Sequence, residues 1–223
     1  MDKFQDFLLF FPIILISVAL HEFAHCWTDD RMGDDTPRLA GRVTLNPLVH
    51  LDPWGTIMMA ISAFWGVGFG WGKPSPFNPQ NFRNPALGRM IGAIAGPLSN
   101  ILQMFAWASL GLLLQLLFAP HVSLMEILDG SGGWLGVAFT LCLYGVIINA
   151  SLAIFNMLPI YPLDGHHVLS YFVPASWRPI LDNPIWGLVL LFLIFNGHVL
   201  GVVLHPLQNG AIYVTRLLVG WPG

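Results

Sequence analysis

Charged residues are scarce in this chain. Only 9% of its 223 residues are Asp, Glu, Lys or Arg, whereas roughly a quarter is usual in soluble proteins. Hydrophobic residues make up 55% of the sequence, and the mean hydropathy is +0.67. So few charges cannot cover the surface of a soluble domain of this size. The composition therefore excludes a soluble enzyme and a disordered chain, and it indicates the lipid bilayer as the surroundings.

Cysteine is nearly absent and basic charge is not in excess. Cys26 and Cys142 are the only cysteines, so a disulfide framework is excluded. The net charge of −3 predicts no nucleic-acid partner. The first apolar segment resembles a secretory signal only weakly, because its single Lys3 lies between Asp2 and Asp6. We expect this segment to be retained as a spanning helix.

Long apolar runs predict a mostly α-helical, polytopic membrane bundle of about four to six spans. We expect one integral-membrane domain over residues 1–223. The predicted spans are 7–30, 88–118, 134–158 and 184–205, and 207–221 is too short to assign. A small β or re-entrant element is expected after the first helix, since residues 38–45 alternate in polarity like a short strand.

One short motif in the first span carries chemistry. His21, Glu22 and His25 form an HExxH pattern, and Glu22 is one of only two glutamates. On a helix, positions i and i+4 share a face, so both imidazoles can reach one metal while the glutamate serves as a general base. The alternative is a cluster of snorkelling polar groups at a helix end. We favour the metal site because ionisable groups at membrane depth are costly.

A hydrolytic zinc site needs a third protein ligand and an open position for water. Asp164 is favoured because it follows Pro159 and Pro162 at the end of a long apolar run, where a helix break requires a polar cavity. The alternative for Asp164 is an ordinary Asp-Gly turn at a membrane surface. The full set of candidate ligands is Asp52, Asp129, Asp164, His50, His166 and His167.

Together with HExxH, the NxxPxxPLDG pattern of residues 156–165 resembles the site-2 protease family of intramembrane metalloproteases. Residues 96–100 are similar to its GPxxN segment, and residues 41–56 to its compact prokaryotic members, which lack a PDZ-like insertion. The resemblance implies an intramembrane zinc endopeptidase with one Zn²⁺ per chain. It implies that His21, His25 and Asp164 bind the zinc and that Glu22 is the catalytic base. The His166-His167 pair departs from the family pattern.

Further residues are candidates for supporting roles. Asn100, Asn156 and His167 could stabilise the oxyanion of the reaction. The glycine-rich stretch 66–72, with Gly68 and Gly70, could pair with an extended substrate as an added strand, or form a re-entrant turn. A stripe of Gly88, Gly92 and Gly96 favours close helix packing within the chain, with dimerisation as the alternative.

The position of the metal site constrains the topology. The HExxH motif and Asp164 each lie near the end of a span, so an even number of crossings must separate them. This holds if residues 55–71 do not cross. Seven basic residues then share one side and only Lys3 faces the other, which the positive-inside rule assigns to the cytoplasm. The seven are Arg31, Arg38, Arg42, Lys73, Arg83, Arg89 and Arg178. We expect a cell-membrane protein whose active site is nearer the cytoplasmic face.

The resemblance also suggests a transmembrane protein as the substrate, cleaved in regulated intramembrane proteolysis. The rival interpretation is a non-proteolytic membrane metal-binding protein or a metal transporter. A transporter should line a path across the bilayer with polar groups, whereas the span 134–158 offers mainly Tyr144, Asn149 and Ser151. A single site near one face favours hydrolysis.

Overall fold

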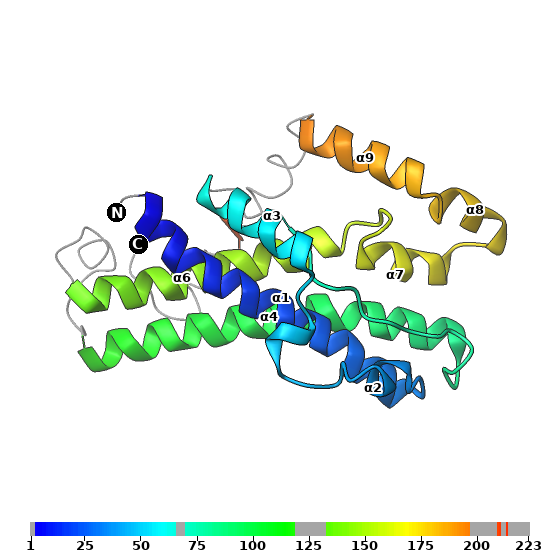
Figure 1. Cartoon of the computed structure of the whole chain (residues 1–223), viewed down its shortest axis with the longest axis horizontal. Helices are drawn as coiled ribbons and strands as arrows, with labels where there is room; N and C mark the ends of the chain where they lie inside the picture. The colour runs from blue at the N-terminus through cyan, green and yellow to red at the C-terminus, as the bar shows by residue number, and fades with distance from the viewer. Residues whose placement is uncertain (1–2, 66–69, 119–132, 197–208, 211–212, 214–223) are drawn as a thin grey trace.

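The computed structural model describes residues 3–65, 70–118, 133–196, 209–210 and 213. Three long helices, α1, α4 and α6, form the body of the molecule, and shorter helices lie alongside them (Figure 1). The helices are α1 (Lys3–Met32), α2 (Thr36–Leu39), α3 (Pro53–Phe64), α4 (Pro85–Phe118), α6 (Gly133–Asn156), α7 (Asp164–Phe172), α8 (Arg178–Leu181) and α9 (Pro184–Asn196). Two short 3₁₀ turns, Pro47–Val49 and Ala175–Trp177, complete the described part.

Helices α1, α4 and α6 have the length and apolarity needed to cross a membrane. They contain 30, 34 and 24 residues, and a helix of about 20 residues already spans the hydrocarbon core. Helix α4 packs against both α1 and α6, with Met104, Phe139 and Val146 in the core between α4 and α6. The predicted polytopic helix bundle is confirmed.

The outside of this bundle is apolar, unlike that of a soluble protein. Large apolar side chains cover its outside; Leu102 of α4 is 64% exposed. Ser17, Asn100 and Asn149, one from each long helix, are fully buried. Because lipid offers no hydrogen bonds, such polar groups can lie only inside the protein.

The segment after the first helix returns to where it starts. Helix α3 has 12 residues and is therefore roughly 18 Å long, too short for the hydrocarbon core of about 30 Å. Leu51, just before α3, pairs with Gly72 in an isolated antiparallel bridge, and the Lys73 amide donates to the His50 carbonyl at 2.7 Å. The entry and exit of this segment thus lie side by side, as expected of a segment that does not cross the membrane. Of the described helices between the HExxH motif and Asp164, α4 and α6 have the length to cross a membrane, which agrees with the even number of crossings that the topology prediction requires.

The prediction of a short strand over residues 38–45 is wrong. Residues 36–39 form helix α2, and Gly41 turns the chain with a φ of 68°. The alternation misleads because the apolar residues are not the buried ones: Leu39 is 79% exposed and Arg42 only 4%. Arg42 donates to the backbone carbonyls of Lys73 and Pro74, at 2.6 and 3.2 Å. It thereby holds the returning segment in place.

Asp34 organises the turn that follows α1. Its buried carboxylate accepts hydrogen bonds from the Thr36 hydroxyl at 2.5 Å, the Asn78 amide at 2.6 Å and the Asn81 side chain at 3.1 Å. Burial by itself would raise the pKa of Asp34, but these hydrogen bonds outweigh it and hold the pKa below its ordinary value of 3.8.

The glycine stripe of α4 packs within the chain. A side chain at Gly88 would meet the Phe82 ring, one at Gly92 the Asp29 carboxylate, and one at Gly96 the imidazole of His25. All three glycines are buried. The intrachain interpretation of the stripe is confirmed, and its glycines are covered by side chains of the same molecule.

Beyond α9, the structure describes only residues 209–210 and 213. The predicted span 184–205 begins as α9, whose 13 described residues end at Asn196. Residues 197–205 of that predicted span, and all of 207–221 except 209–210 and 213, lie outside the described residues. The number of spans beyond α6 therefore stays a prediction.

Candidate metal centre

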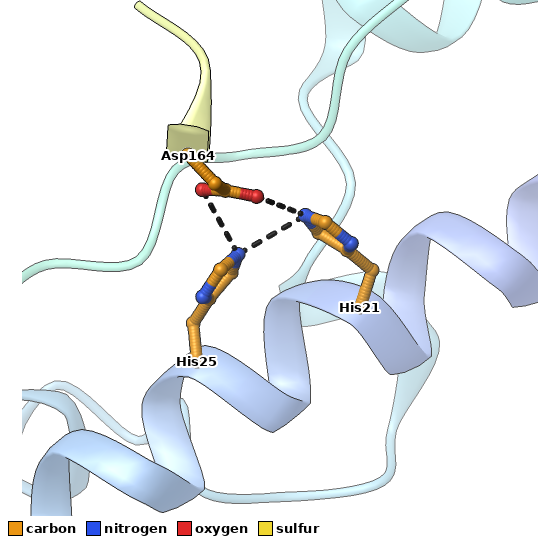
Figure 2. A group of neighbouring side chains, drawn as sticks. All are labelled: His21, His25 and Asp164. Carbon is orange, nitrogen blue, oxygen red and sulfur yellow. Dashed lines mark hydrogen bonds and ion pairs between the residues drawn. The ribbon is translucent and has the colours of Figure 1, made fainter. Parts of the chain in front are cut away.

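Two helices bring the predicted metal ligands together. His21 and His25 project from one face of α1, and Asp164 begins α7 directly after the break that ends α6 (Figure 2). The His21 Nε2 lies 3.2 Å from Asp164 Oδ2, and the His25 Nε2 lies 3.4 Å from Oδ1. The two Nε2 atoms are 3.0 Å apart. Three ligand atoms, all within 4.8 Å of one another, thus converge on one point.

The outer nitrogen of each imidazole is engaged elsewhere. The His25 Nδ1 lies 2.7 Å from the Gly92 carbonyl oxygen, and the His21 Nδ1 lies 2.6 Å from the Asn100 Oδ1. A carbonyl oxygen only accepts, so each Nδ1 carries a proton, and the Nε2 of the neutral imidazole then has the lone pair that a metal needs. Such a hydrogen bond on the outer nitrogen is the usual support of a metal-ligating histidine.

The donor set fits a cation. With the proton of each neutral imidazole on Nδ1, two Nε2 lone pairs and a carboxylate face one another. Asp164 Oδ2 is accordingly buried without a hydrogen bond from the described residues. Two histidines and one carboxylate form a usual ligand set of catalytic zinc, which leaves a position open for water.

The other candidate ligands in the described chain are engaged elsewhere. Asp52 caps α3 by accepting from the Gly55 amide at 2.8 Å, and the His50 Nε2 donates to the Thr44 carbonyl at 2.8 Å. The His166 Nε2 lies 2.8 Å from Asp182 Oδ1. Asp129 lies outside the described residues.

Glu22 stands beside the metal cluster and lines the same cavity. This cavity measures about 390 Å³ and is bounded by α1, residues 70–77, α4, the end of α6 and the start of α7. Gly72 lies against the glutamate; a Cβ there would be 3.0 Å from Glu22 Cγ and 3.1 Å from Oε1. The cavity therefore has room for more than a water molecule next to a carboxylate that can move a proton.

His167 presents a neutral imidazole to the cavity. The Arg89 guanidinium donates to its Nδ1 through Nε at 3.2 Å and through Nη2 at 3.0 Å. Burial and the Arg89 charge lower the pKa of His167 to about 4. Its Nδ1 is therefore an acceptor, and the remaining proton is on Nε2.

The remaining predicted site residues occupy different positions. Asn156 lines the cavity, and its Nδ2 donates to the Leu152 carbonyl at 2.9 Å. Gly70 also lines the cavity, but a side chain there would meet Met59 and the Gly55 carbonyl oxygen. Gly68 lies outside the described residues.

Three residues of this region were not singled out from the sequence as members of the site. Asp29 lies one turn beyond His25, is 5% exposed and lines the cavity. Arg89 fixes His167, and Asn149 bonds Asn100. The spacing of Asp29 from His25 was a usable signal, because both lie on one helix face. Arg89 and Asn149 carry no such signal in the sequence, because their link to the site depends on contacts between helices that are distant in sequence.

The helices and the cluster define a polytopic membrane protein with a site of metallopeptidase type. A family model described as peptidase family M50 matches residues 9–195. The chain therefore belongs to peptidase family M50, the site-2 protease family, and is a zinc metalloendopeptidase. This membership decides against the transporter interpretation.

The similar proteins agree with this assignment. YwhC of Bacillus subtilis (strain 168), provisionally named a zinc metalloprotease, is 33% identical over 219 residues, which cover 94% of this chain and 92% of YwhC. Rip2 of Mycobacterium tuberculosis (strain H37Rv), with the same provisional name, is 29% identical over 85% of this chain and 69% of Rip2. No solved structure matches this chain.

Proposed function

We propose that this protein hydrolyses a peptide bond in or near the transmembrane segment of a membrane protein. The observation that carries the proposal is the convergence of His21, His25 and Asp164 beside Glu22, in a cavity lined by helices of membrane-spanning length. A soluble metallopeptidase would have no reason to enclose its site in this way. Regulated intramembrane proteolysis is the process that such a site would serve.

In this proposal His21, His25 and Asp164 hold one zinc ion per chain. Zinc, when bound, supplies a Lewis acid that polarises the scissile carbonyl and makes water acidic. Glu22 takes the proton from the attacking water and later delivers it to the leaving amine. Its carboxylate lies on the cavity side of α1, next to both histidines, which suits that transfer.

Among the oxyanion candidates, His167 is the best supported. A neutral imidazole whose Nδ1 is occupied by Arg89 has an Nε2–H group available for an oxyanion in the cavity. Asn156 is the second candidate, because it also lines the cavity. Asn100 fits this role poorly, because its oxygen faces His21 and its amino group faces Asn149.

The substrate we propose is a transmembrane helix that unwinds locally. The backbone groups of a helix are bonded internally, so cleavage must free some of them. Residues 70–72 lie along the cavity, and an extended substrate could recover main-chain hydrogen bonds there. The cavity would lie nearer the cytoplasmic face of the cell membrane, given the seven-to-one distribution of basic residues.

A set of single substitutions tests the assignment. His21→Ala, His25→Ala and Asp164→Ala should each lose zinc from the purified protein, because each removes a ligand. Glu22→Gln should keep zinc and lose cleavage by a factor of about 10²–10⁴, the usual contribution of a general base. Zinc is measured by metal analysis, and cleavage by gel assay of a transmembrane substrate in detergent or liposomes.

Two outcomes would contradict the proposal. Full zinc content in Asp164→Ala would remove Asp164 from the ligand set, and wild-type cleavage by Glu22→Gln would remove the base. Comparative membrane proteomics of wild type and Glu22→Gln identifies substrates, because uncleaved proteins should accumulate only with the variant.

A further inference from the structure

A chain of buried amides runs from the third long helix to the metal cluster. Asn149 of α6 and Asn100 of α4 are both fully buried, as is Ser17 of α1. Asn100 Nδ2 lies 2.9 Å from Asn149 Oδ1, and Asn100 Oδ1 lies 2.6 Å from His21 Nδ1. Asn149 does not touch the metal cluster, but the side chain of Asn100 connects it to His21.

The direction of every hydrogen bond in this chain follows from one backbone carbonyl. Asn149 Nδ2 lies 2.9 Å from the Gly145 carbonyl oxygen, which can only accept, so the amino end of Asn149 faces Gly145. Its oxygen must then face Asn100 and accept from the amino group there. The oxygen of Asn100 is left for His21, whose Nδ1 must donate. Ser17 is compatible with this orientation, since its hydroxyl can accept from Asn149 Nδ2 at 3.0 Å.

We infer that Asn149 is a positioning residue, which fixes the tautomer of His21 through Asn100 and so keeps the His21 Nε2 lone pair free for zinc. This inference rests on the proposed ligand set. His25 does not depend on such a chain, because its Nδ1 donates directly to the Gly92 carbonyl, which cannot reverse its polarity. Only His21 therefore depends on the orientation of an amide.

Without the Asn149 side chain, the Asn100 amide should no longer be held in one orientation. Without the Asn149 oxygen, the buried Asn100 amino group has lost its acceptor, and burying an unpaired polar group is costly. The Asn100 amide can then rotate and present its amino group to His21 Nδ1. That arrangement moves the imidazole proton to Nε2, where it occupies the lone pair that zinc requires. Loss of such outer contacts typically lowers metal affinity about 10–100-fold.

The experiment measures zinc affinity of the purified full chain by competition with a chromogenic chelator. Asn149→Leu, similar in shape and unable to accept, should bind zinc about 10–100-fold more weakly. Asn149→Asp should stay close to wild type, because a protonated buried carboxyl still donates to Gly145 and accepts from Asn100. Adding Asn100→Asp to Asn149→Leu should restore most of the affinity, because a carboxylate has no amino group to turn towards His21.

The outcomes separate this inference from the proposed function. If Asn149→Leu binds zinc like wild type while His21→Ala does not, the inference fails and the ligand set stands. If His21→Ala itself keeps zinc, the ligand set fails. Weak binding by Asn149→Leu without recovery in the double variant would mean a merely structural role and would also overturn the inference.

Folding of each variant is checked by its elution profile and thermal unfolding. If Asn149→Leu does not fold, Asn149→Asp decides. A folded Asn149→Asp protein that has lost zinc affinity refutes the inference, and one that keeps it supports an acceptor at this position. The visible absorption of the cobalt-substituted proteins gives a second measurement, because it changes when one imidazole leaves the metal.

Discussion

Gly96 gives the sharpest test of the metal centre, because it leaves the space in which both imidazoles lie. A Cβ at this position would fall against His25 Nε2 and 2.6 Å from His21 Cε1. Ordinary van der Waals contact begins at 3.4 Å, so Gly96→Ala must push the His21 ring back by about 0.8 Å and the His25 ring further. Zinc–nitrogen bonds tolerate only about 0.2 Å around 2.0–2.1 Å.

We therefore expect Gly96→Ala to bind zinc at least about 100-fold more weakly, the upper end of what loss of outer contacts produces, because here the ligands themselves move. That factor corresponds to about 2.8 kcal/mol. The assay is chelator competition on purified protein, with thermal unfolding measured in parallel. Cleavage should fall with zinc occupancy, and excess zinc should restore part of it.

Gly88→Ala is the matched control, two turns earlier on the same stripe of α4. Its new methyl group would lie 2.6 Å from the Phe82 ring, a contact equally short but with a side chain that bonds neither histidine. We expect a loss of stability of about 1–3 kcal/mol, as for other overpacked positions, with zinc affinity unchanged. Equal zinc affinity in Gly96→Ala and Gly88→Ala would refute the reasoning, since it would mean that the imidazoles have room to adjust.

Three further predictions concern the parts around the site. Cysteines at positions 35 and 80, on a cysteine-free background, should both react with a cytoplasmic-side reagent and not from outside; labelling from opposite sides would contradict the topology. Asp34→Asn should destabilise the protein at pH 7, and the difference from wild type should shrink as the pH falls below the ordinary pKa of 3.8. Because the pKa of Asp34 is lowered by folding, its contribution to stability is fully present above the unfolded-state pKa and is lost as the pH falls through the folded-state pKa. A stability difference between the variant and wild type that persists at low pH in thermal unfolding would contradict this prediction. Gly70→Val should disturb helix α3, because the new side chain would meet Met59, so a reduced cleavage rate with unchanged stability would instead favour a direct role in substrate binding.

The local motifs could be predicted from the sequence because each carries its geometry within a few residues. HExxH places two imidazoles on one face of a helix wherever that helix packs. Asp164 was identifiable because Pro159 and Pro162 must end a helix that cannot end in lipid without polar partners. The topology followed from the requirement that these two pieces meet.

The polar residues between helices could not be assigned in the same way. Asn149 looked like one of a few polar residues in a span, and its role depends on Asn100 lying opposite it, 49 positions away. The strand over residues 38–45 failed for a related reason. Alternation predicts a half-buried strand only if apolar residues face inward, whereas next to a membrane Leu39 faces outward and the buried position belongs to Arg42.

The buried amides also show how a polar site can be satisfied inside an apolar bundle. Each polar group that the chemistry needs must be satisfied before the substrate arrives, since lipid supplies no hydrogen bonds. The outer nitrogen of His25 is satisfied by a backbone carbonyl, and that of His21 by Asn100, which Asn149 satisfies in turn. With both Nδ1 atoms donating outwards, the Nε2 lone pairs of the neutral histidines and the Asp164 carboxylate face the centre of the cluster. A site built in this way favours a cation at that point, and it accounts for the fully buried Ser17, Asn100 and Asn149 in a chain with very few charges.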